Sequence, residues 1–311
     1  MFLQIVLLLF GLLMVICGAN YLVDGASSIA RKTGISEFVI GLVIVGFGTS
    51  LPELVVSVTG AIAHNSDIAV GNVIGSNVFN TSLILAFSAM IAPVAISRQN
   101  KFRDIPLTIL VTFLVAFMGK YGGLSRVEGI IMVVLFGLYI FYCFRTDSIE
   151  IEEGSEDVRI LPAALSWTMI VGGLACLILG GRLFVHSAEA IARMLGVSDK
   201  FIAITVLAMG TSLPEFITSI VALVKKRSQM ALGNILGSNV FNLLLILGIS
   251  AIISPTSFAR IDIWDYVAVL LSIILVWTGV YTGKKNILDR FDASLLLILF
   301  VAYMTKLFIT L

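Results

Sequence analysis

Long runs of apolar residues alternate with short polar segments along the whole chain, and most runs are long enough to cross a membrane. A transmembrane helix needs about 20 apolar residues to cross roughly 30 Å of hydrocarbon. Hydropathy predicts helices at roughly the following positions: 2–30, 36–62, 68–91, 105–119, 127–144, 162–194, 198–224, 229–252, 264–281 and 292–310. The pattern therefore predicts an all-α polytopic membrane protein.

The composition agrees with this prediction. Hydrophobic residues make up 59% of the 311-residue chain and charged residues only 13%, whereas a water-soluble domain has about 25% charged residues. The formal net charge of +1 gives no electrostatic reason to bind nucleic acid. We expect a lipid bilayer as the surroundings, with no nucleic-acid partner and no obligate protein partner.

An internal repeat decides the expected architecture. Gly18–Pro93 aligns without gaps with Gly180–Pro255, a displacement of 162 residues, and the match is too long to be accidental. We expect a first five-helix repeat at 1–144, an acidic connector at 145–161 and a second five-helix repeat at 162–311. Because five is odd, the second unit must enter the membrane in the opposite sense. The prediction is ten transmembrane helices as two inverted repeats.

Basic residues predict the orientation. Most lysines and arginines fall in the loops after odd-numbered spans, for example Lys225, Lys226 and Arg227. Since cytoplasmic loops are rich in such residues, both termini are expected outside the cytoplasm. The compact length and lack of a targeting segment favour the cell membrane of a prokaryote. Arg182, near the sixth span, is expected to snorkel towards the interface or to pair locally.

The stretch GTSLPE occurs twice, at Gly48–Glu53 and at Gly210–Glu215, each time inside an apolar span. Proline lacks an amide hydrogen and clashes with the carbonyl one turn earlier, so each copy should break its helix. In hydrocarbon, the freed carbonyls are tolerable only where they line a polar cavity or find partners. The breaks therefore predict clusters of oxygen atoms at mid-membrane depth, and oxygen is the ligand that Ca²⁺ and Na⁺ prefer.

A second motif, GNVIGSNVFN, begins at Gly71 and recurs as GNILGSNVFN at Gly233. Its glycines, four residues apart, share one helix face and permit close packing. Its serine and its last asparagine are also four apart and should share a face. Each repeat thus offers a carboxylate, hydroxyl groups, an amide and broken-helix carbonyls to a site at the pseudo-two-fold axis.

Two glutamates in mid-membrane, Glu53 and Glu215, are the strongest sign of a cation site, because intramembrane carboxylates are functional by default. Facing carboxylates would repel by about 4 kcal/mol at a separation of about 4 Å and an effective dielectric near 20. A divalent cation, several Na⁺ ions or protonation removes that conflict. The site should therefore bind Ca²⁺, Na⁺ or protons.

Other interpretations of the residues remain open. The motif positions hold no cysteine, methionine or histidine, which argues against soft transition metals. An intramembrane enzyme could use paired glutamates as acid and base, but no nucleophile–base pair or zinc motif accompanies them, so no enzymatic activity and no cofactor is expected. A channel is possible, although inverted repeats with broken helices favour a carrier.

The doubled GTSLPE and GNxxGSN motifs, with five spans in each half, resemble the sodium/calcium exchanger family of the cation/calcium antiporter superfamily. The resemblance covers nearly the whole chain. It implies exchange of Ca²⁺ for Na⁺ by alternating access, in which the long first and sixth helices slide across the rest. Exchange of Ca²⁺, or another divalent cation, for protons is the alternative within the same superfamily, whose proton-coupled members usually lack GNxxGSN.

The same resemblance implies a diamond of four ion sites. Glu53 and Glu215 match its central carboxylates, which Ca²⁺ and Na⁺ share, and Thr49 and Thr211 match backbone carbonyl ligands of Ca²⁺. Each flanking Na⁺ site takes two serines and a carbonyl, and these are Ser50, Ser76 and Gly46 for one site, and Ser212, Ser238 and Ala208 for the other.

Asn80 and Asn242 match the two middle positions, and here the chain departs from many sodium/calcium exchangers, which carry an aspartate at one of them. With asparagine at both, the site has two formal negative charges. These balance one Ca²⁺ but leave three Na⁺ with one positive charge in excess. The charge count therefore weakens the expectation of three Na⁺ per Ca²⁺.

Overall fold

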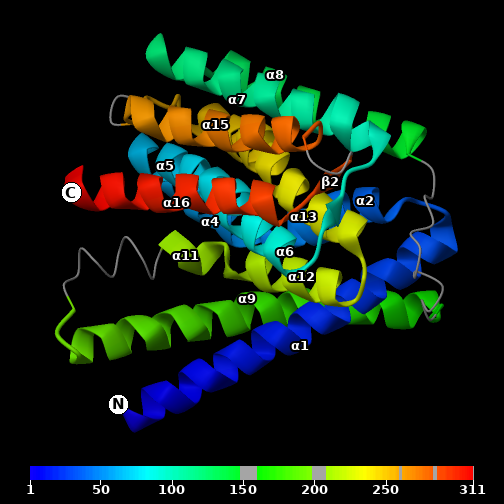
Figure 1. The fold of residues 1–311 in the computed structure, drawn as a ribbon. Helices are drawn as coiled ribbons and strands as arrows, with labels where there is room; N and C mark the ends of the chain where they lie inside the picture. The colour runs from blue at the N-terminus through cyan, green and yellow to red at the C-terminus, as the bar shows by residue number, and fades with distance from the viewer. Residues whose placement is uncertain (148–159, 198–207, 259–260, 283–285, 311) are drawn as a thin grey trace.

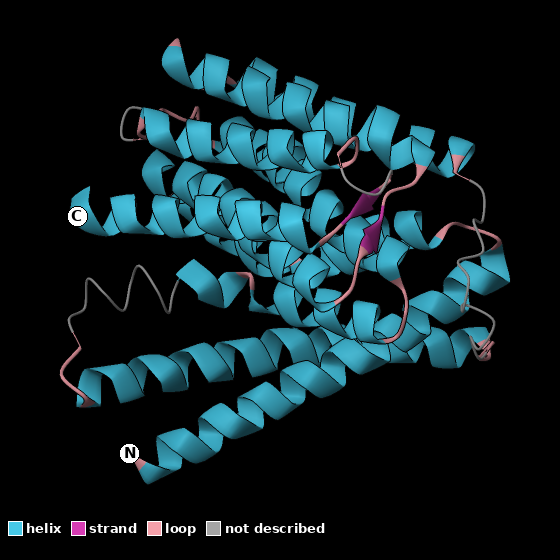
Figure 2. Ribbon diagram, viewed as in Figure 1, coloured by secondary structure: helices cyan, strands magenta, loops and turns pink. Residues whose placement is uncertain are grey.

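The computed structural model describes residues 1–147, 160–197, 208–258, 261–282 and 286–310. Nearly all of these residues are helical (Figure 2). In the first half the helices, with π-helical turns marked η, are α1 (Phe2–Thr33), α2 (Glu37–Ile40), η1 (Gly41–Gly46), α3 (Phe47–Thr49), α4 (Leu51–Ile62), α5 (Ser66–Val78), η2 (Phe79–Leu85), α6 (Ala86–Ile91), η3 (Asn100–Asp104), α7 (Ile105–Lys120) and α8 (Arg126–Thr146).

The second half follows the same plan. Its described helices are α9 (Ala163–Met194), α11 (Ala208–Thr211), α12 (Leu213–Val224), α13 (Ser228–Val240), η6 (Phe241–Ile246), α14 (Leu247–Ile253), α15 (Ile263–Gly279) and α16 (Arg290–Thr310). The expected all-α class needs one small correction. Strands β1 (Val94–Ala95) and β2 (Ile287–Leu288) form an antiparallel pair in which Val94 lies opposite Leu288, because two loops meet side by side at one end of the helices.

Seven continuous helices in the described ranges are long and apolar enough to cross a membrane, and a bent pair, Glu37–Thr49 with Leu51–Ile62, gives an eighth candidate. The remaining two expected spans correspond to the shorter apolar helices α12 and α15. The first ten residues of the span expected at 198–224, and most of the connector expected at 145–161, lie outside the described residues. The molecule is a multi-pass helical membrane protein.

Two central helical segments form the core, and the long outer helices surround them. In Ser228–Ile253 and Ser66–Ile91, 83% and 72% of the most apolar stretch is buried, whereas the figure is 22% for α1 and for α8. The outer helices expose large apolar side chains such as Phe2, Ile298 and Val301. Such surfaces fit a surrounding of lipid, because lipid hydrocarbon is as apolar as the side chains themselves.

Helices α1 and α9 cross along a seam of glycines at one side of the molecule (Figure 1). Gly11, Gly18 and Gly25 recur every seven residues on α1, and a Cβ atom added to Gly18 would lie 2.7 Å from the carbonyl oxygen of Gly173 on α9. At Gly11 the nearest atom would be the carbonyl oxygen of Gly180, at 2.8 Å. The two backbones are therefore in direct contact, as small residues allow in membranes.

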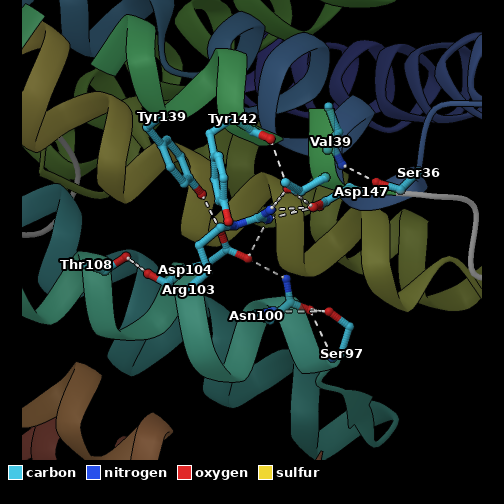
Figure 3. A network of polar contacts seen from close by, with 11 residues as sticks. Ser36, Val39, Ser97, Asn100, Arg103, Asp104, Thr108, Tyr139, Tyr142 and Asp147 are labelled. Carbon is cyan, nitrogen blue, oxygen red and sulfur yellow. Dashed lines mark hydrogen bonds and ion pairs between the residues drawn. The ribbon is translucent and has the colours of Figure 1, made fainter. Parts of the chain in front are cut away.

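A buried polar network fixes the end of α8 against η3 (Figure 3). The guanidinium of Arg103 donates from Nε to Asp104 (2.7 Å) and from Nη2 to Asp147 (2.9 Å). The Asp104 side chain is fully buried and also accepts hydrogen bonds from Tyr139 (2.8 Å) and Asn100 (3.0 Å).

This network corrects the expected start of the fourth span. The apolar pattern predicted a helix at 105–119, but the helical segment begins at Asn100. The polar residues Lys101, Arg103 and Asp104 belong to the helix rather than to a loop, because the network satisfies the two buried charges that hydropathy alone counts as unfavourable.

Candidate cation-binding site

Each GTSLPE motif breaks its helix at the serine. The backbone dihedrals are φ −83° and ψ 8° at Ser50, and φ −86° and ψ 5° at Ser212, so the two breaks have the same local geometry. In the first repeat the segments on either side of the break are bent by 51°. Pro52 and Pro214 stand in the first turn of the helices that follow, where a missing N–H costs nothing. The predicted helix breaks are confirmed.

Both motif glutamates lie in the first turn of the helix that starts at the break. Glu53 is the third residue of α4 and Glu215 the third residue of α12, and each side chain is only 1% exposed. The positive end of the helix dipole favours a carboxylate at this position. The break thus makes room for a charge deep inside the protein and partly stabilises it.

Hydrogen bonds cross between the two repeats at the glutamates. Ser50 Oγ donates to Glu215 Oε1 at 3.0 Å, and Ser212 Oγ donates to Glu53 Oε1 at 3.4 Å. The serine of each motif therefore binds the carboxylate of the other copy. This exchange places the two breaks face to face in the middle of the molecule.

Several buried oxygens around the breaks accept no hydrogen bond within the described ranges. They include Oε2 of Glu53 and of Glu215, and Oδ1 of Asn80 and of Asn242. Buried polar atoms are normally satisfied, so a cluster of orphaned acceptors points to a missing positive partner. Oxygen-only ligands of this kind fit Ca²⁺ and Na⁺.

Neutral oxygens have to complete any such site. Among the residues that the structure describes, no three His, Cys, Asp or Glu side chains come together. A cation at the breaks would therefore meet two carboxylates, with hydroxyl, amide and carbonyl oxygens as the remaining ligands. This set suits alkali and alkaline-earth ions better than transition metals.

The second motif supplies polar groups from the central helices. Ser76 lies on α5 and Ser238 on α13, while Asn80 and Asn242 lie at the start of the π-helical turns η2 and η6. All four are at most 4% exposed. π-Helical turns are rare and are frequently found at functional sites.

The backbone positions named from the sequence lie on the segments before the breaks. The Gly46 carbonyl, grouped with Ser50 and Ser76 from the sequence, accepts a hydrogen bond from Ser238 Oγ of the other repeat at 3.4 Å. Thr49 is fully buried, and Thr211 lines a cavity beside α9. Ala208 begins α11, directly after the residues that are not described.

The glycines of the second motif pack closely in one repeat. A Cβ atom on Gly233 would lie 2.2 Å from the Phe38 carbonyl oxygen, and one on Gly237 would lie 2.8 Å from Cα of Leu42. This confirms the predicted packing for α13. Gly71 and Gly75 have no described atom within 4 Å of such a position, so the prediction for α5 stays untested.

Two asparagines that the sequence reasoning left without a role hold the breaks in place. Asn234 Nδ2 donates to the Glu215 carbonyl (3.2 Å) and to Ser219 Oγ (2.8 Å), and its Oδ1 accepts from Thr49 (3.1 Å). In the other repeat, Asn72 Nδ2 donates to the Glu53 carbonyl at 3.1 Å. The sequence did contain a sign of this role, because both asparagines directly follow the first glycine of the repeated GNxxGSN motif.

Comparison with known proteins gives a consistent answer. The family described as sodium/calcium exchanger protein matches residues 3–145 and 165–309. The chain belongs to the sodium/calcium exchanger family. Sodium/calcium exchanger MaX1 of Methanosarcina acetivorans is 30% identical, with 97% of each chain covered. CaxA of Alkalimonas amylolytica, named as an antiporter, is 37% identical over 97% of this chain and 98% of its own.

The fold matches as well. A solved structure of the sodium-calcium exchanger NCX_Mj superposes with a TM-score of 0.86 at 30% identity, covering 98% of this chain and 99% of that one. Membership confirms the resemblance drawn from the motifs. The family consists of membrane transporters of Na⁺ and Ca²⁺, not of enzymes, and needs no cofactor. This chain is a cation/calcium antiporter of the prokaryotic type.

Proposed function

We propose that the chain exchanges Ca²⁺ for Na⁺ across the membrane through one site between the two helix breaks, where the ions compete. The observation that carries the proposal is the crossed pair of hydrogen bonds, from Ser50 to Glu215 and from Ser212 to Glu53. They bring two buried carboxylates, each with one unpartnered oxygen, to the junction of the repeats. A divalent cation or several Na⁺ ions would neutralise both.

The proposed architecture has ten spans in two inverted five-helix repeats, at 1–144 and 162–311, joined by the connector at 145–161. The matching geometry of the breaks at Ser50 and Ser212 supports the repeat. The two termini lie at the same end of the molecule (Figure 1), which suits an even number of crossings. The distribution of basic residues places that end outside the cytoplasm of a prokaryotic cell membrane in this proposal.

The proposed ligands follow the pseudo-symmetry. Glu53 and Glu215 bind Ca²⁺ between them, with the backbone carbonyls of Thr49 and Thr211. Six oxygens result if both carboxylates bind through two atoms, which is within the range of about 6–8 that Ca²⁺ takes. Flanking Na⁺ ions use carbonyl and serine oxygens, from Gly46, Ser50, Ser76, Ala208, Ser212 and Ser238, and the middle positions are Asn80 and Asn242.

The proposed exchange follows from shared ligands. Because Ca²⁺ and Na⁺ both need the two carboxylates, loading one ion releases the other. An empty site is unfavourable, since two buried carboxylates repel each other. Access then alternates between the two sides as α1 and α9 move against the core. These helices are paired with each other along the glycine seam, so they can move together.

Protons are the competing partner in exchange. Asn80 and Asn242 leave the site with two formal charges, and three Na⁺ would exceed that charge by one. A proton on either glutamate could also release Ca²⁺. We favour Na⁺ because both GNxxGSN motifs are present and both of their serines, Ser76 and Ser238, are buried.

Reconstitution of the purified chain tests the proposal and needs no added protein. Proteoliposomes loaded with Na⁺ should take up radioactive Ca²⁺, and liposomes with only an outward proton gradient should not. Glu53→Gln and Glu215→Gln should each abolish uptake. Glu128→Gln is the matched control, because this glutamate closes a capping box at the start of α8 and glutamine can do the same.

Uptake driven only by protons would reject Na⁺ coupling and favour exchange of Ca²⁺ for protons. Retained uptake in either glutamate variant would reject the site, whatever the coupling ion. Loss of uptake in Glu128→Gln would mean that loss of an acidic side chain harms the protein in general. The site residues would then have to be tested by Ca²⁺ binding instead.

A further inference from the structure

A cavity of about 320 Å³ lies beside the second helix break, between α9 and the segments that carry the motifs. Pro52, Thr211 and Pro214 line it on the motif side. On the other side its lining follows α9 from Ile178 to Glu189, towards the C-terminal end of that helix. The cavity therefore lies against the two GTSLPE motifs, next to the proposed cation site, and extends along α9. The C-terminal end of α9 lies at the end of the molecule where both termini lie (Figure 1).

Three ionisable side chains of α9 line this cavity: Arg182, His186 and Glu189. Glu189 is neutralised locally, since its carboxylate accepts hydrogen bonds from Arg193 at 2.9 and 3.2 Å. Arg182 has no hydrogen bond or ion pair with any residue that the structure describes, and its side chain is exposed. The local pairing expected from the sequence is thus not found within the described ranges, and Arg182 presents an uncompensated positive charge to the cavity.

The positive charge of Arg182 has no counterpart at the equivalent position of the first repeat. The position related to Arg182 by the displacement of 162 residues is Asn20 on α1, which is neutral. One turn further, Asp24 is paired with Lys225 at 2.6 Å. On the α1 side, Lys225 also donates to the Asn20 carbonyl at 3.3 Å, but its charge is balanced by Asp24. A positive charge without a partner among the described residues is therefore a feature of the α9 side and not a consequence of the repeat.

We propose that Arg182 determines cation specificity on this approach by slowing Ca²⁺ more than Na⁺. The inference rests on the proposed function of the neighbouring site. Repulsion scales with the charge of the ion, so a divalent cation meets twice the barrier of a monovalent one. For charges about 10 Å apart in a water-filled path, Coulomb's law gives roughly a fourfold slowing of Ca²⁺ and a twofold slowing of Na⁺.

The test compares variants in proteoliposomes at low ionic strength and with cations below saturation. Arg182→Gln should raise the initial rate of Ca²⁺ uptake about fourfold and that of Na⁺ uptake about twofold, so their ratio doubles. Arg182→Lys, which keeps the charge, should resemble the unchanged protein. Salt near 1 M should remove the difference, because the screening length falls to about 3 Å. Arg126→Gln on α8 is the control for loss of an exposed arginine.

An unchanged Ca²⁺/Na⁺ ratio in Arg182→Gln, in a protein that otherwise exchanges the ions, would overturn the inference. So would a lysine variant that behaves like the glutamine variant, since the effect would then be one of shape. Should Arg182→Gln not fold, Glu189→Gln gives the reciprocal test, because it makes the same cavity more positive and should lower the ratio. Absence of exchange in the unchanged protein would reject the proposed function itself.

Discussion

Removal of one guanidinium should destabilise the fold far from the cation site. Arg103 neutralises two carboxylates, and the side chain of Asp104 is 0% exposed. Arg103→Gln would leave both acids without their cation in a buried place. Breaking a buried pair by removing one partner costs about 3–5 kcal/mol. Tyr139→Phe removes a single donor to Asp104 and should cost about 2 kcal/mol.

The sharper test is a double variant. Arg103→Gln combined with Asp104→Asn removes the fully buried charge together with its partner, so that only Asp147 loses its cation. The amide keeps one oxygen, which can accept from Tyr139 or from Asn100. We expect the double variant to be more stable than Arg103→Gln alone, because the unpaired charge and not the lost contact causes most of the cost.

Thermal unfolding of the detergent-solubilised protein measures these effects. At roughly 2 °C per kcal/mol for a chain of this size, Arg103→Gln should lower the midpoint by about 6–10 °C. Ca²⁺ uptake per folded molecule should change little, since no hydrogen bond or ion pair among the described residues links the network to either break. A loss below about 1 kcal/mol in Arg103→Gln, or a double variant less stable than that single variant, would refute the reasoning.

Three further outcomes are expected. Gly18→Leu should reduce transport at least tenfold because its side chain would meet the backbone of α9, whereas Gly137→Leu, with open space around it, should not; uptake assays compare them. Asn234→Ala should weaken Ca²⁺ binding more than Asn72→Ala, since Asn234 also holds Thr49 of the other repeat; equilibrium binding of radioactive Ca²⁺ shows the order. Asn242→Asp should increase the Na⁺ carried per Ca²⁺, measured as a change in reversal potential, and an unaltered potential would contradict the charge count.

The sequence predicted the helix breaks well because proline and glycine act on the backbone next to them. Ser50 and Ser212 have the expected broken geometry, and the family follows from the same motifs. Hydropathy also found the seven helices that are long enough to span a membrane. These features depend only on residues that are close together in the chain, so a single sequence is enough to predict them.

Features that depend on distant partners were not predictable. The π-helical turns at Asn80 and Asn242 have no local signature, since the same residue types form ordinary helix elsewhere. Arg103 was assigned to a loop because its carboxylate partner Asp147 comes 44 residues later in the chain. The contact of Gly46 with Ser238 crosses the repeats, and pseudo-symmetry alone did not indicate which repeat the carbonyl faces.

The crossed serine–glutamate hydrogen bonds have a consequence for the evolution of the duplicated chain. Neither copy of the motif contains all the hydrogen-bond donors of its own glutamate, because Ser50 donates to Glu215 and Ser212 donates to Glu53. A lone copy of the repeated unit would lack the serine that donates to its glutamate. In the proposed inverted architecture, two separate copies would have to meet in opposite orientations to form these bonds. Fusion into one chain keeps the two copies together. Positions outside these contacts are then free to diverge, as at Asn20 and its equivalent Arg182.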